Sequence, residues 1–309
     1  MPGGILPPDS GVPLEDYFTF QRFDLYFEPN FIPIHIPANR IVTTVFDLSF
    51  ALFPEWHSRD KVLYFKMHFW DKIKRVDRSI VISDFIKNEA INRFGFSQDR
   101  LTTIHLGFDH EIFKIYPPQA LETVKAQYRL PENFILFVGS IEPRKNLKSL
   151  LRAYMGLKNM VRKKFKVVLV GFRRWKNDEI MSLIGKLKSV VSYIGYVPED
   201  DLGKLYNLAH LFIYPSLYEG FGLPPLEAMA CGCPVIASDV SSLPEVCGDA
   251  VHYINPYEVE SITEGIDRVL KDNSLRSSLI SRGLERAKEF TWEKSAKEHL
   301  RVFEEVTNI

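Results

Sequence analysis

Cysteine is scarce in this chain of 309 residues. The three cysteines are Cys231, Cys233 and Cys247. An odd number gives no disulfide framework and indicates a reducing compartment. Since no second cluster of ligands lies near the Cys-Gly-Cys pair, we interpret both residues as small buried side chains rather than as a metal or redox site.

An excess of one charge is also lacking. Lys+Arg and Asp+Glu each total 39, so the formal net charge is zero. Because nucleic-acid binders usually carry a basic excess, nucleic acid is not the expected main partner. No segment approaches the roughly 18 continuous apolar residues of a membrane helix, and no signal peptide opens the chain. We therefore expect a cytoplasmic protein, either free or peripheral at the inner face of the membrane.

Motifs that bind metal are missing as well. No Asp-x-Asp occurs, so the usual carboxylate bridge to a metal-bound diphosphate is lacking. Most of the eight histidines show no metal-ligand spacing and are interpreted as structural. We expect no metal ion and no cofactor.

The carboxyl-terminal half alternates short apolar strands with amphipathic helices. Each expected strand is a nearly continuous apolar run that ends at Gly, Pro, Ser or Asp, as is typical of parallel strands buried on both faces. This alternation predicts an α/β fold with a doubly wound, Rossmann-type sheet. The expected strands are 134–140, 165–171, 191–197, 211–216 and 234–239, and the expected helices are 146–160, 178–189, 200–210 and 224–231.

The amino-terminal half repeats this pattern less cleanly. Residues 114–119 contain paired prolines and are interpreted as a linker, because proline disfavours helices and central strands. We expect a reduced Rossmann-like domain over 1–115, a second one over 120–290, and a closing helix over 291–309. We expect the first domain to be incomplete, because its Pro/Gly-rich opening has no strand before it. Expected strands are 25–30, 40–47, 79–83 and 101–107, with helices at 58–75 and 84–94.

Aromatic residues are concentrated near the start of the chain. Residues 17–70 hold fifteen of the forty Phe, Trp and Tyr residues. Core packing is the first interpretation. The alternative is a surface for a lipid-linked acceptor, a membrane or a partner protein.

The most informative segment is 215-PSLYEGFGLPPLEAMACGCPVIASD-239. It runs from a buried strand through a loop with Gly220 and Gly222 into a helix with prolines in its first turn, where proline is tolerated. The free amides and the dipole of a helix amino terminus favour an anionic group. Glu219 and Glu227 can face the same cleft, where carboxylates accept hydrogen bonds from sugar and ribose hydroxyls. For Glu227, a first-turn acid that complements the helix dipole is the alternative.

A second segment, 138-VGSIEPRKNLKSLL-151, has the same strand–loop–helix order. Arg144 and Lys145 lie in its loop, where they can neutralise a diphosphate leaving group. A basic pair at a helix start opposes the helix dipole unless an anion binds there. The spacing of a Walker phosphate loop is absent.

Together these segments resemble glycosyltransferase family 4, the large retaining group with the GT-B fold, and especially its bacterial mannosyltransferase-like members. The resemblance runs from about residue 12 to the end. Its strongest part is the family's E-x7-E motif, which Glu219 and Glu227 match. The resemblance implies two Rossmann-type domains that face a cleft.

The resemblance also implies roles for single residues. Glu219 would contact the hydroxyls of the donor sugar, and Glu227 those of the ribose. The backbone of Phe221, Gly222 and Leu223 would lie along the sugar and phosphate. Arg144 and Lys145 match the basic pair that binds the diphosphate in the family. Gly139 matches the glycine that precedes this pair.

Two departures from the family pattern concern catalysis. The family usually has His-Asp where this chain has Phe46-Asp47, so an imidazole cannot act from that position. Relatives also carry further residues before the first strand found here. At the end of the first domain, His105 and Asp109 are further candidates to face the cleft.

The sequence therefore predicts a metal-independent, retaining hexosyltransferase of polysaccharide synthesis. Its substrates would be a nucleotide sugar, with GDP-mannose as the best guess, and a glycan or lipid-linked acceptor. The alternatives are a non-catalytic subunit that binds a nucleotide sugar or a partner enzyme, and a nucleotide-sugar epimerase.

Overall fold

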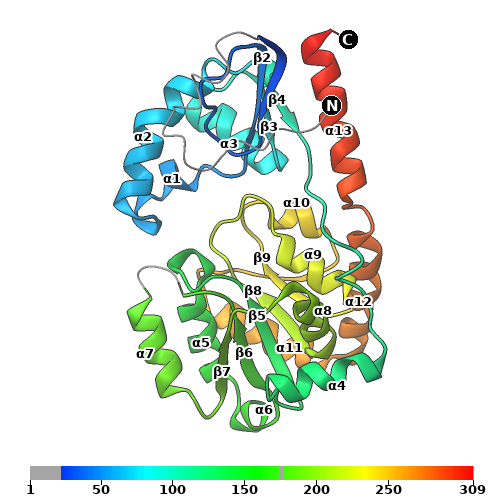
Figure 1. The fold of residues 1–309 in the computed structure, drawn as a ribbon. Coiled ribbons are helices and arrows are strands. Elements are labelled where there is room, and N and C mark those ends of the chain that lie inside the picture. Colours follow the sequence, from blue (N-terminus) through cyan, green and yellow to red (C-terminus); the bar gives the residue numbers. More distant parts are fainter. Residues whose placement is uncertain (1–21, 174–176, 309) are drawn as a thin grey trace.

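The computed structural model describes residues 22–173 and 177–308. These residues form two parallel β-sheets, each packed with helices (Figure 1). The expected α/β architecture with two Rossmann-type sheets is thus confirmed. The Pro/Gly-rich opening and the first aromatic residues of the sequence lie outside the described residues.

The first sheet has the strand order β1-β2-β3-β4, and all of its strands are parallel. Ser58 and Ser83 each cap a helix by accepting a hydrogen bond from a backbone N–H of the first turn, which satisfies an otherwise unpaired amide. The elements are β1 (Phe23–Glu28), β2 (Ala38–Val45), α1 (Ser49–Leu52), α2 (Arg59–Ile73), β3 (Arg78–Val81), α3 (Asp84–Phe94) and β4 (Leu101–Thr103), with short 3-10 turns at Pro54–Trp56 and Gln98–Arg100.

The aromatic residues of this half mostly form its core. Phe50, Phe65 and Phe69 are buried and pack with one another, and Trp70 lies partly buried against them. The core interpretation is therefore confirmed for these residues. Three other large side chains on α2, those of Leu63, Tyr64 and Met67, are exposed.

The second sheet has the strand order β10-β9-β8-β5-β6-β7 and is also parallel. Its strands are β5 (Phe134–Val138), β6 (Lys166–Val170), β7 (Val191–Gly195), β8 (Leu211–Tyr214), β9 (Val235–Ser238) and β10 (His252–Ile254). Its helices are α4 (Pro118–Gln127), α5 (Leu147–Gly156), α6 (Asn159–Lys164), α7 (Asp178–Lys186), α8 (Glu199–Leu208), α9 (Leu223–Ala230), α10 (Leu243–Cys247), α11 (Val259–Lys271) and α12 (Asn273–Ala287).

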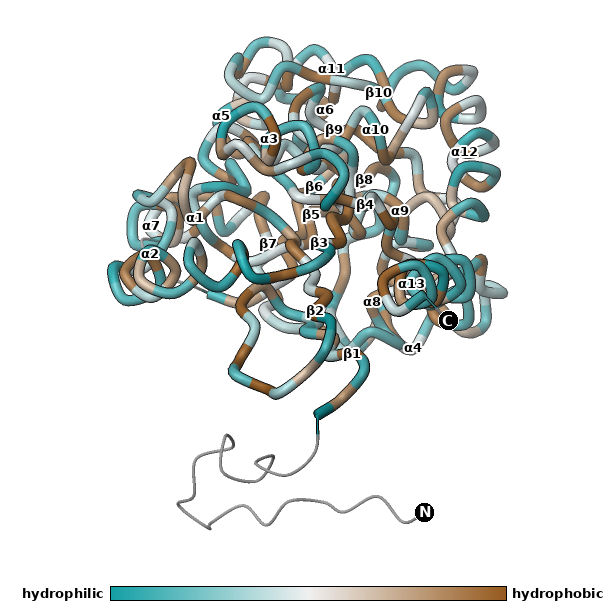
Figure 2. Tube along the Cα trace, turned by 90° about the horizontal axis from the view of Figure 1, so that it is seen from above, coloured by the Kyte–Doolittle hydropathy of each residue, from teal (hydrophilic) through white to brown (hydrophobic). Residues whose placement is uncertain are grey.

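Residues alternate between the two faces of this sheet, as the period of a strand requires. On β5, Leu136 packs into a core with α4, α8, α9 and α10, whereas Ile135 and Phe137 pack into a second core with α5, α7 and α11. Helices α11 and α12 alternate hydrophobic and hydrophilic residues in Figure 2. Both faces of the sheet are therefore covered, and the loops at its ends are left for ligands.

Two expectations need correction. The linker over 114–119 ends inside a helix, since α4 begins at Pro118. Proline is suited to a first helical turn because its missing N–H has no intrahelical partner there. The strand expected over 101–107 ends at Thr103, although the Ile104 amide still donates to Val81.

The last helix, α13 (Trp292–Thr307), follows α12 of the second sheet but packs on β1 and β2 of the first (Figure 1). The rings of Phe27 and Phe303 lie 5.0 Å apart, and the Arg40 side chain donates to the carbonyl of Val306. This helix and the 104–117 segment both connect the two sheets. None of the described helices is both long and apolar enough to cross a membrane.

Candidate functional site

The carboxyl ends of β5 and β8 lie side by side in the second sheet. The loop after β5 leads to a 3-10 turn at Pro143–Lys145, and the loop after β8 leads to α9. The two loops are joined by a backbone hydrogen bond from the Leu217 amide to the Arg144 carbonyl, 2.9 Å long. In parallel α/β sheets, ligands bind at the carboxyl ends of the strands.

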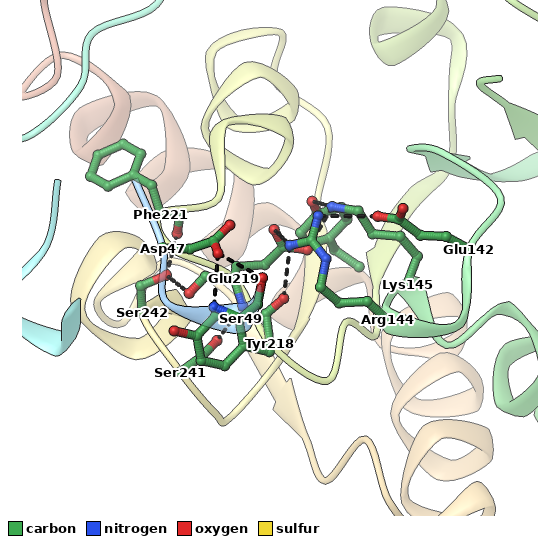
Figure 3. A network of polar contacts seen from close by, with 12 residues as sticks. Asp47, Ser49, Glu142, Arg144, Lys145, Tyr218, Glu219, Phe221, Ser241 and Ser242 are labelled. Atoms are coloured by element: carbon green, nitrogen blue, oxygen red, sulfur yellow. Dashed lines mark hydrogen bonds and ion pairs between the residues drawn. The ribbon is translucent and has the colours of Figure 1, made fainter. Parts of the chain in front are cut away.

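A buried ionic cluster occupies this edge (Figure 3). Arg144 Nη1 lies 2.8 Å from Glu219 Oε2, and Lys145 Nζ lies 2.6 Å from Glu219 Oε1. Arg144 also pairs with Glu142 at 3.1 Å. Glu142, Lys145 and Glu219 are each less than 9% exposed. Two cations and two carboxylates are thus collected in a place where water screens their charges poorly.

Tyr214, at the end of β8, completes the cluster. Lys145 Nζ donates to its hydroxyl at 2.5 Å and also lies 4.8 Å from the centre of its ring. Burial raises the pKa of Tyr214 well above its ordinary value, so the phenol stays neutral. The ammonium group of Lys145 is therefore held between an anion and a neutral aromatic acceptor.

The charges in the cluster stabilise one another. Burial opposes ionisation of Glu219, but the charges of Arg144 and Lys145 outweigh it and lower the pKa of this carboxyl to about 2. Burial likewise opposes the charge on Arg144, yet Glu219 and Glu142 together raise its pKa. Burial lowers the pKa of Lys145, and Glu219 opposes that effect. Glu219 is therefore ionised at neutral pH and pairs with both basic side chains, and Glu142 supplies the second negative charge.

The basic pair predicted from the sequence, Arg144 and Lys145, forms ion pairs with the carboxylate of Glu219 in the same chain. The sequence placed Arg144 and Lys145 at a helix start, whereas the structure places them in the 3-10 turn and separates them from α5 by Asn146, which has a left-handed φ of 57°. Gly139 follows β5 directly, and an added Cβ there would lie 3.7 Å from the Lys145 side chain. The sequence predicted that Glu219 contacts the donor sugar. In the structure both of its carboxylate oxygens accept hydrogen bonds from Arg144 and Lys145.

The loop that carries Glu219 is fixed by two serines from the segment after β9. Ser242 Oγ donates to the carbonyls of Glu219 and Phe221, at 2.9 and 2.7 Å. Ser241 Oγ accepts from the Glu219 amide at 3.1 Å. Gly222 then takes a φ of 115°, which favours glycine, and α9 begins at Leu223 with prolines in its first turn, as predicted.

Glu227 lies on α9, apart from the ionic cluster. Its carboxylate accepts a hydrogen bond of 2.9 Å from the hydroxyl of Tyr206 on α8. Burial is the main cause that raises the pKa of Glu227 from 4.5 to about 7, and the Tyr206 hydrogen bond opposes it. Glu227 therefore changes its charge near neutral pH, whereas Glu219 does not.

The first sheet approaches this loop closely. A Cβ added at Gly220 would lie 2.0 Å from the carbonyl oxygen of Phe46, so only glycine fits at this contact. Ser83 Oγ donates to the Gly220 carbonyl at 2.7 Å, and the Tyr218 hydroxyl donates to Glu89 at 2.7 Å. From the sequence, Gly220 was expected to let a ligand approach the backbone. The structure shows that it also lets the backbone at Phe46, in the half of the first sheet, come close.

Asp47 lies at the same contact and anchors a polar chain. Its Oδ1 accepts from the amide and the hydroxyl of Ser49, at 2.8 and 2.6 Å, and Ser49 Oγ lies 2.9 Å from His57 Nε2. His57 is buried, and its Nδ1 has no hydrogen-bond partner among the described residues. Phe46 itself packs against Phe31, with ring centres 5.5 Å apart.

The two candidates near the end of the first domain have structural partners. His105 Nε2 lies 2.8 Å from Glu245 on α10, whose oxygens also accept from the amides of Asp84 and Phe85 at the start of α3. Asp109 accepts from the backbone amides of Glu111 and Ile112, which closes a turn. His105 thus belongs to a contact between the two sheets, and Asp109 shapes the following segment.

Several residues of this site were missed in the sequence. Tyr206 and Tyr214 lie in regular elements, where an aromatic residue gives no signal beyond core packing. Glu142 stands two residues before Arg144, a spacing that carries no motif. The three cysteines are buried and free, and no described group of three or more His, Cys, Asp or Glu side chains could hold a metal ion.

The ionic cluster makes a prediction about stability. Replacing Glu219 by Gln leaves two buried cations with one carboxylate fewer, and breaking such a pair costs about 3 kcal/mol or more. We expect the free energy of unfolding of Glu219→Gln, measured by urea denaturation, to fall by that amount. As a control, Glu293→Gln removes a pair with Lys297 on the surface and should cost less than about 1 kcal/mol. Equal losses in both variants would contradict the role given to the cluster.

Comparison with known proteins agrees with this geometry. Residues 122–286, which include both loops, match the family model "Glycosyl transferases group 1". The chain is 38% identical over 282 residues to O-antigen chain mannosyltransferase B of Escherichia coli, covering 91% of this chain and 73% of that protein. It is 34% identical to the serotype-specific mannosyltransferase WbdA of Escherichia coli, covering 75% of this chain but only 29% of WbdA.

A solved structure shows the same fold. Alr3699/HepE of Anabaena, crystallised in complex with UDP and glucose, superimposes with a TM-score of 0.74 at 19% identity, covering 91% of this chain and 78% of that one. The family match, the mannosyltransferase relatives and the shared two-sheet architecture agree. The chain belongs to the group 1 glycosyl transferases, a family of hexosyltransferase-type enzymes with the GT-B fold.

Proposed function

We propose that this chain transfers a hexose, with mannose as the best candidate, from a nucleoside-diphosphate sugar to a glycan or lipid-linked acceptor in surface polysaccharide synthesis, with retention of the anomeric configuration. The observation that carries the proposal is the basic pair at the carboxyl edge of the second sheet, in which the side chain of Arg144 is 19% exposed and that of Lys145 is 8% exposed. A diphosphate is a leaving group that this pair is suited to stabilise.

In this reaction, negative charge develops on the diphosphate as the bond to the anomeric carbon breaks. Arg144 offers a planar fork and Lys145 a point charge for the phosphate oxygens. The turn at Pro143–Lys145 holds both residues at the edge of the sheet before a donor binds, and cations placed in advance stabilise charge as it develops. The chain's own cations would thereby supply the positive charge at the diphosphate.

Donor binding then requires an exchange of partners. A diphosphate that takes up Arg144 and Lys145 competes with Glu219 for the same donors. Glu219 is thereby released to accept hydrogen bonds from the hydroxyls of the sugar, the role that the family resemblance implies for it. Glu227 would accept the two hydroxyls of the ribose.

The relatives narrow the choice of substrates. One is named as an O-antigen chain mannosyltransferase, a second as a serotype-specific mannosyltransferase, and HepE was crystallised with UDP and glucose. The former favour mannose and a glycan acceptor here, and GDP-mannose as the donor. We place the acceptor on the side of the first sheet, across the contact between Phe46 and Gly220, and we expect the enzyme at the inner face of the membrane.

One observation favours the alternative of a non-catalytic subunit. Phe46 replaces the histidine that is usual in the family, and its ring packs against Phe31 instead of offering a polar atom. Such a subunit would bind the nucleotide sugar without transferring it. A nucleotide-sugar epimerase, the third alternative, would release a changed sugar with no acceptor.

The first functional prediction concerns the basic pair. We expect one of GDP, UDP, dTDP and ADP to bind in calorimetry, and Arg144→Ala to weaken that binding. The rate of sugar transfer, measured with the matching donor and a mannan oligosaccharide, should fall roughly 10²–10³-fold. Arg282 on α12 forms an ion pair with Asp249, and Arg282→Ala serves as the control that should leave both the binding and the rate unchanged. Binding without any transfer or donor conversion would support the non-catalytic subunit instead.

The second prediction concerns pH and Glu227. Only the ionised carboxylate accepts two ribose hydroxyls, and its pKa in the folded protein is about 7. We expect nucleotide affinity to be about tenfold higher at pH 8 than at pH 6, following the ionised fraction. The matched variant Glu227→Gln should bind weakly at both pH values. An equal pH dependence in wild type and variant would show that another group titrates.

The same shift makes a prediction for stability. Because the folded protein holds the Glu227 proton more tightly than the unfolded chain does, wild type loses stability as the pH rises from about 4.5 to about 7. Glu227→Gln avoids that loss and keeps a group that can accept from Tyr206. The urea midpoint of the variant minus that of wild type should therefore be larger at pH 8 than at pH 5. The opposite order would contradict burial of an ionisable Glu227.

A further inference from the structure

A cavity lies at the end of the second sheet that is opposite the ionic cluster. Its volume is about 400 Å³, which is within the range of pockets that hold small molecules. Its lining includes Phe165 and His210, which directly precede β6 and β8, so it lies at the amino ends of these strands. In Figure 1, the neighbouring helix α6 lies at the end of this sheet that faces away from the first sheet. The cavity is therefore remote from the candidate donor site.

Basic side chains gather around this cavity without acidic ones. Four residues of its lining are basic, namely Lys164, His210, Lys271 and Arg276, and no Asp or Glu of the described residues contributes to the lining. Lys271 pairs with Asp267 at 2.5 Å. Neither Lys164 nor Arg276 has an ion pair within the part of the chain that the structure describes. Positive charges that converge without an acid repel one another, so the arrangement favours a bound anion.

The guanidinium group of Arg276 has hydrogen-bond donors that are not satisfied. Its Nη1 donates to Asn273 Oδ1 over 3.4 Å, which is a long hydrogen bond. Its Nε is buried and has no hydrogen-bond partner among the residues described here. Buried N–H groups without an acceptor are rare in native proteins and often indicate an unoccupied water, ion or ligand position. Because a guanidinium group binds phosphate through parallel N–H bonds, Arg276 is suited to that anion.

His210 lies close to two of the cations. Its ring packs against Phe165, with ring centres 5.2 Å apart, and Lys164 Nζ lies 5.2 Å from the centre of the same Phe165 ring. Burial lowers the pKa of His210, and the positive charges of Arg276 and Lys164 lower it further. The carboxylate of Glu132, which is not part of the lining, acts in the opposite direction. An anion bound among these groups would also raise the pKa of His210.

The chemistry of the lining indicates the class of ligand. Arginine and lysine are both suited to phosphate, the former as a fork and the latter as a point charge. Val161, Phe165 and Leu270 line the same cavity and offer apolar surface to the rest of a ligand. A cavity of this volume takes a small molecule whole, whereas nucleic acid requires a longer basic surface in a chain of basic excess. A free phosphorylated compound therefore fits best.

We propose that this cavity is a second ligand site, in which Lys164, His210 and Arg276 bind the phosphate group of a small phosphorylated compound while the apolar lining holds the rest of it. The four residues of β8 separate the cavity from the loop that carries Glu219, a length of about 13 Å at about 3.3 Å per residue. The site is thus separate from the candidate donor site, and it does not depend on the proposed function.

An NMR titration of the full chain with inorganic pyrophosphate tests the proposal, because this probe stays polyanionic at the pH values where histidine titrates. We expect pyrophosphate to shift the imidazole resonances of His210 until they saturate, and to raise its pKa by about one unit. The double variant Lys164→Gln/Arg276→Gln removes two of the phosphate-binding side chains and should weaken binding at His210 at least about tenfold. Unchanged resonances of His210, or the same affinity in the double variant, would overturn the proposal.

The matched control removes the same two kinds of charge elsewhere. Lys294 and Arg301 are exposed on α13, and Lys294→Gln/Arg301→Gln should respond to pyrophosphate like wild type. Chloride at equal ionic strength should leave the His210 resonances nearly unchanged, since it only screens charges. An equal loss in the control variant, or an equal shift with chloride, would reduce the effect to general attraction of anions and contradict a specific site.

Two further comparisons separate this site from other phosphate sites. Arg144→Ala should weaken nucleotide binding but leave the response of His210 to pyrophosphate unchanged, whereas Lys164→Gln/Arg276→Gln should bind nucleotide like wild type. Failure of the second site is thereby distinguishable from failure of the proposed transferase activity. If phosphatidic acid vesicles or a DNA duplex compete for His210 at a lower phosphate concentration than pyrophosphate does, the assignment to a small free compound is wrong.

Discussion

The Arg144–Glu219–Lys145 ion pairs are the interaction on which the site depends. One carboxylate holds two cations at the meeting point of two loops, and all three groups are largely withdrawn from water. The pairs can form only because β5 and β8 are neighbours in the sheet, which places the loops after them side by side. The order of the strands is thus what brings residues 144 and 219 together.

The same cluster joins stability to function. A buried carboxylate between two cations stabilises the fold as a counterion, and an entering diphosphate would take over that role. Glu227 shows the reverse relation, because its ionised form is unfavourable in its buried place and yet is the form that can accept ribose hydroxyls. Groups whose pKa values are pushed apart in this way are typical of functional sites. Glu219 is charged at neutral pH, whereas Glu227 changes its charge near neutral pH.

The contact between the sheets adds a second constraint. Gly220 faces the Phe46 carbonyl too closely for any side chain, and Glu245 receives hydrogen bonds from the amides at the start of α3. The loop that carries Glu219 is therefore positioned by both sheets at once. A change on either side of the opening is expected to reach the ionic cluster through this loop.

Much of this arrangement could be predicted from the sequence, because it depends on local patterns. Apolar runs predicted the strands of the second sheet, and the Gly-Leu-Pro-Pro segment predicted the start of α9. The boundary at Pro118 was misjudged because paired prolines suit both a linker and a first helical turn. Pairing of Glu219 with Arg144 could not be predicted, since the residues are 75 positions apart and only the strand order brings them together. The pKa of Glu227 depends on burial beneath α8, which no local pattern encodes.

The most direct test of this account is a crystal structure of the protein with a bound nucleoside-diphosphate sugar. The account predicts the diphosphate within hydrogen-bonding distance of Arg144 and Lys145, about 3 Å, with Glu219 turned to the sugar. It also predicts the ribose hydroxyls on Glu227. A donor bound elsewhere, with both ion pairs of Glu219 intact, would contradict it.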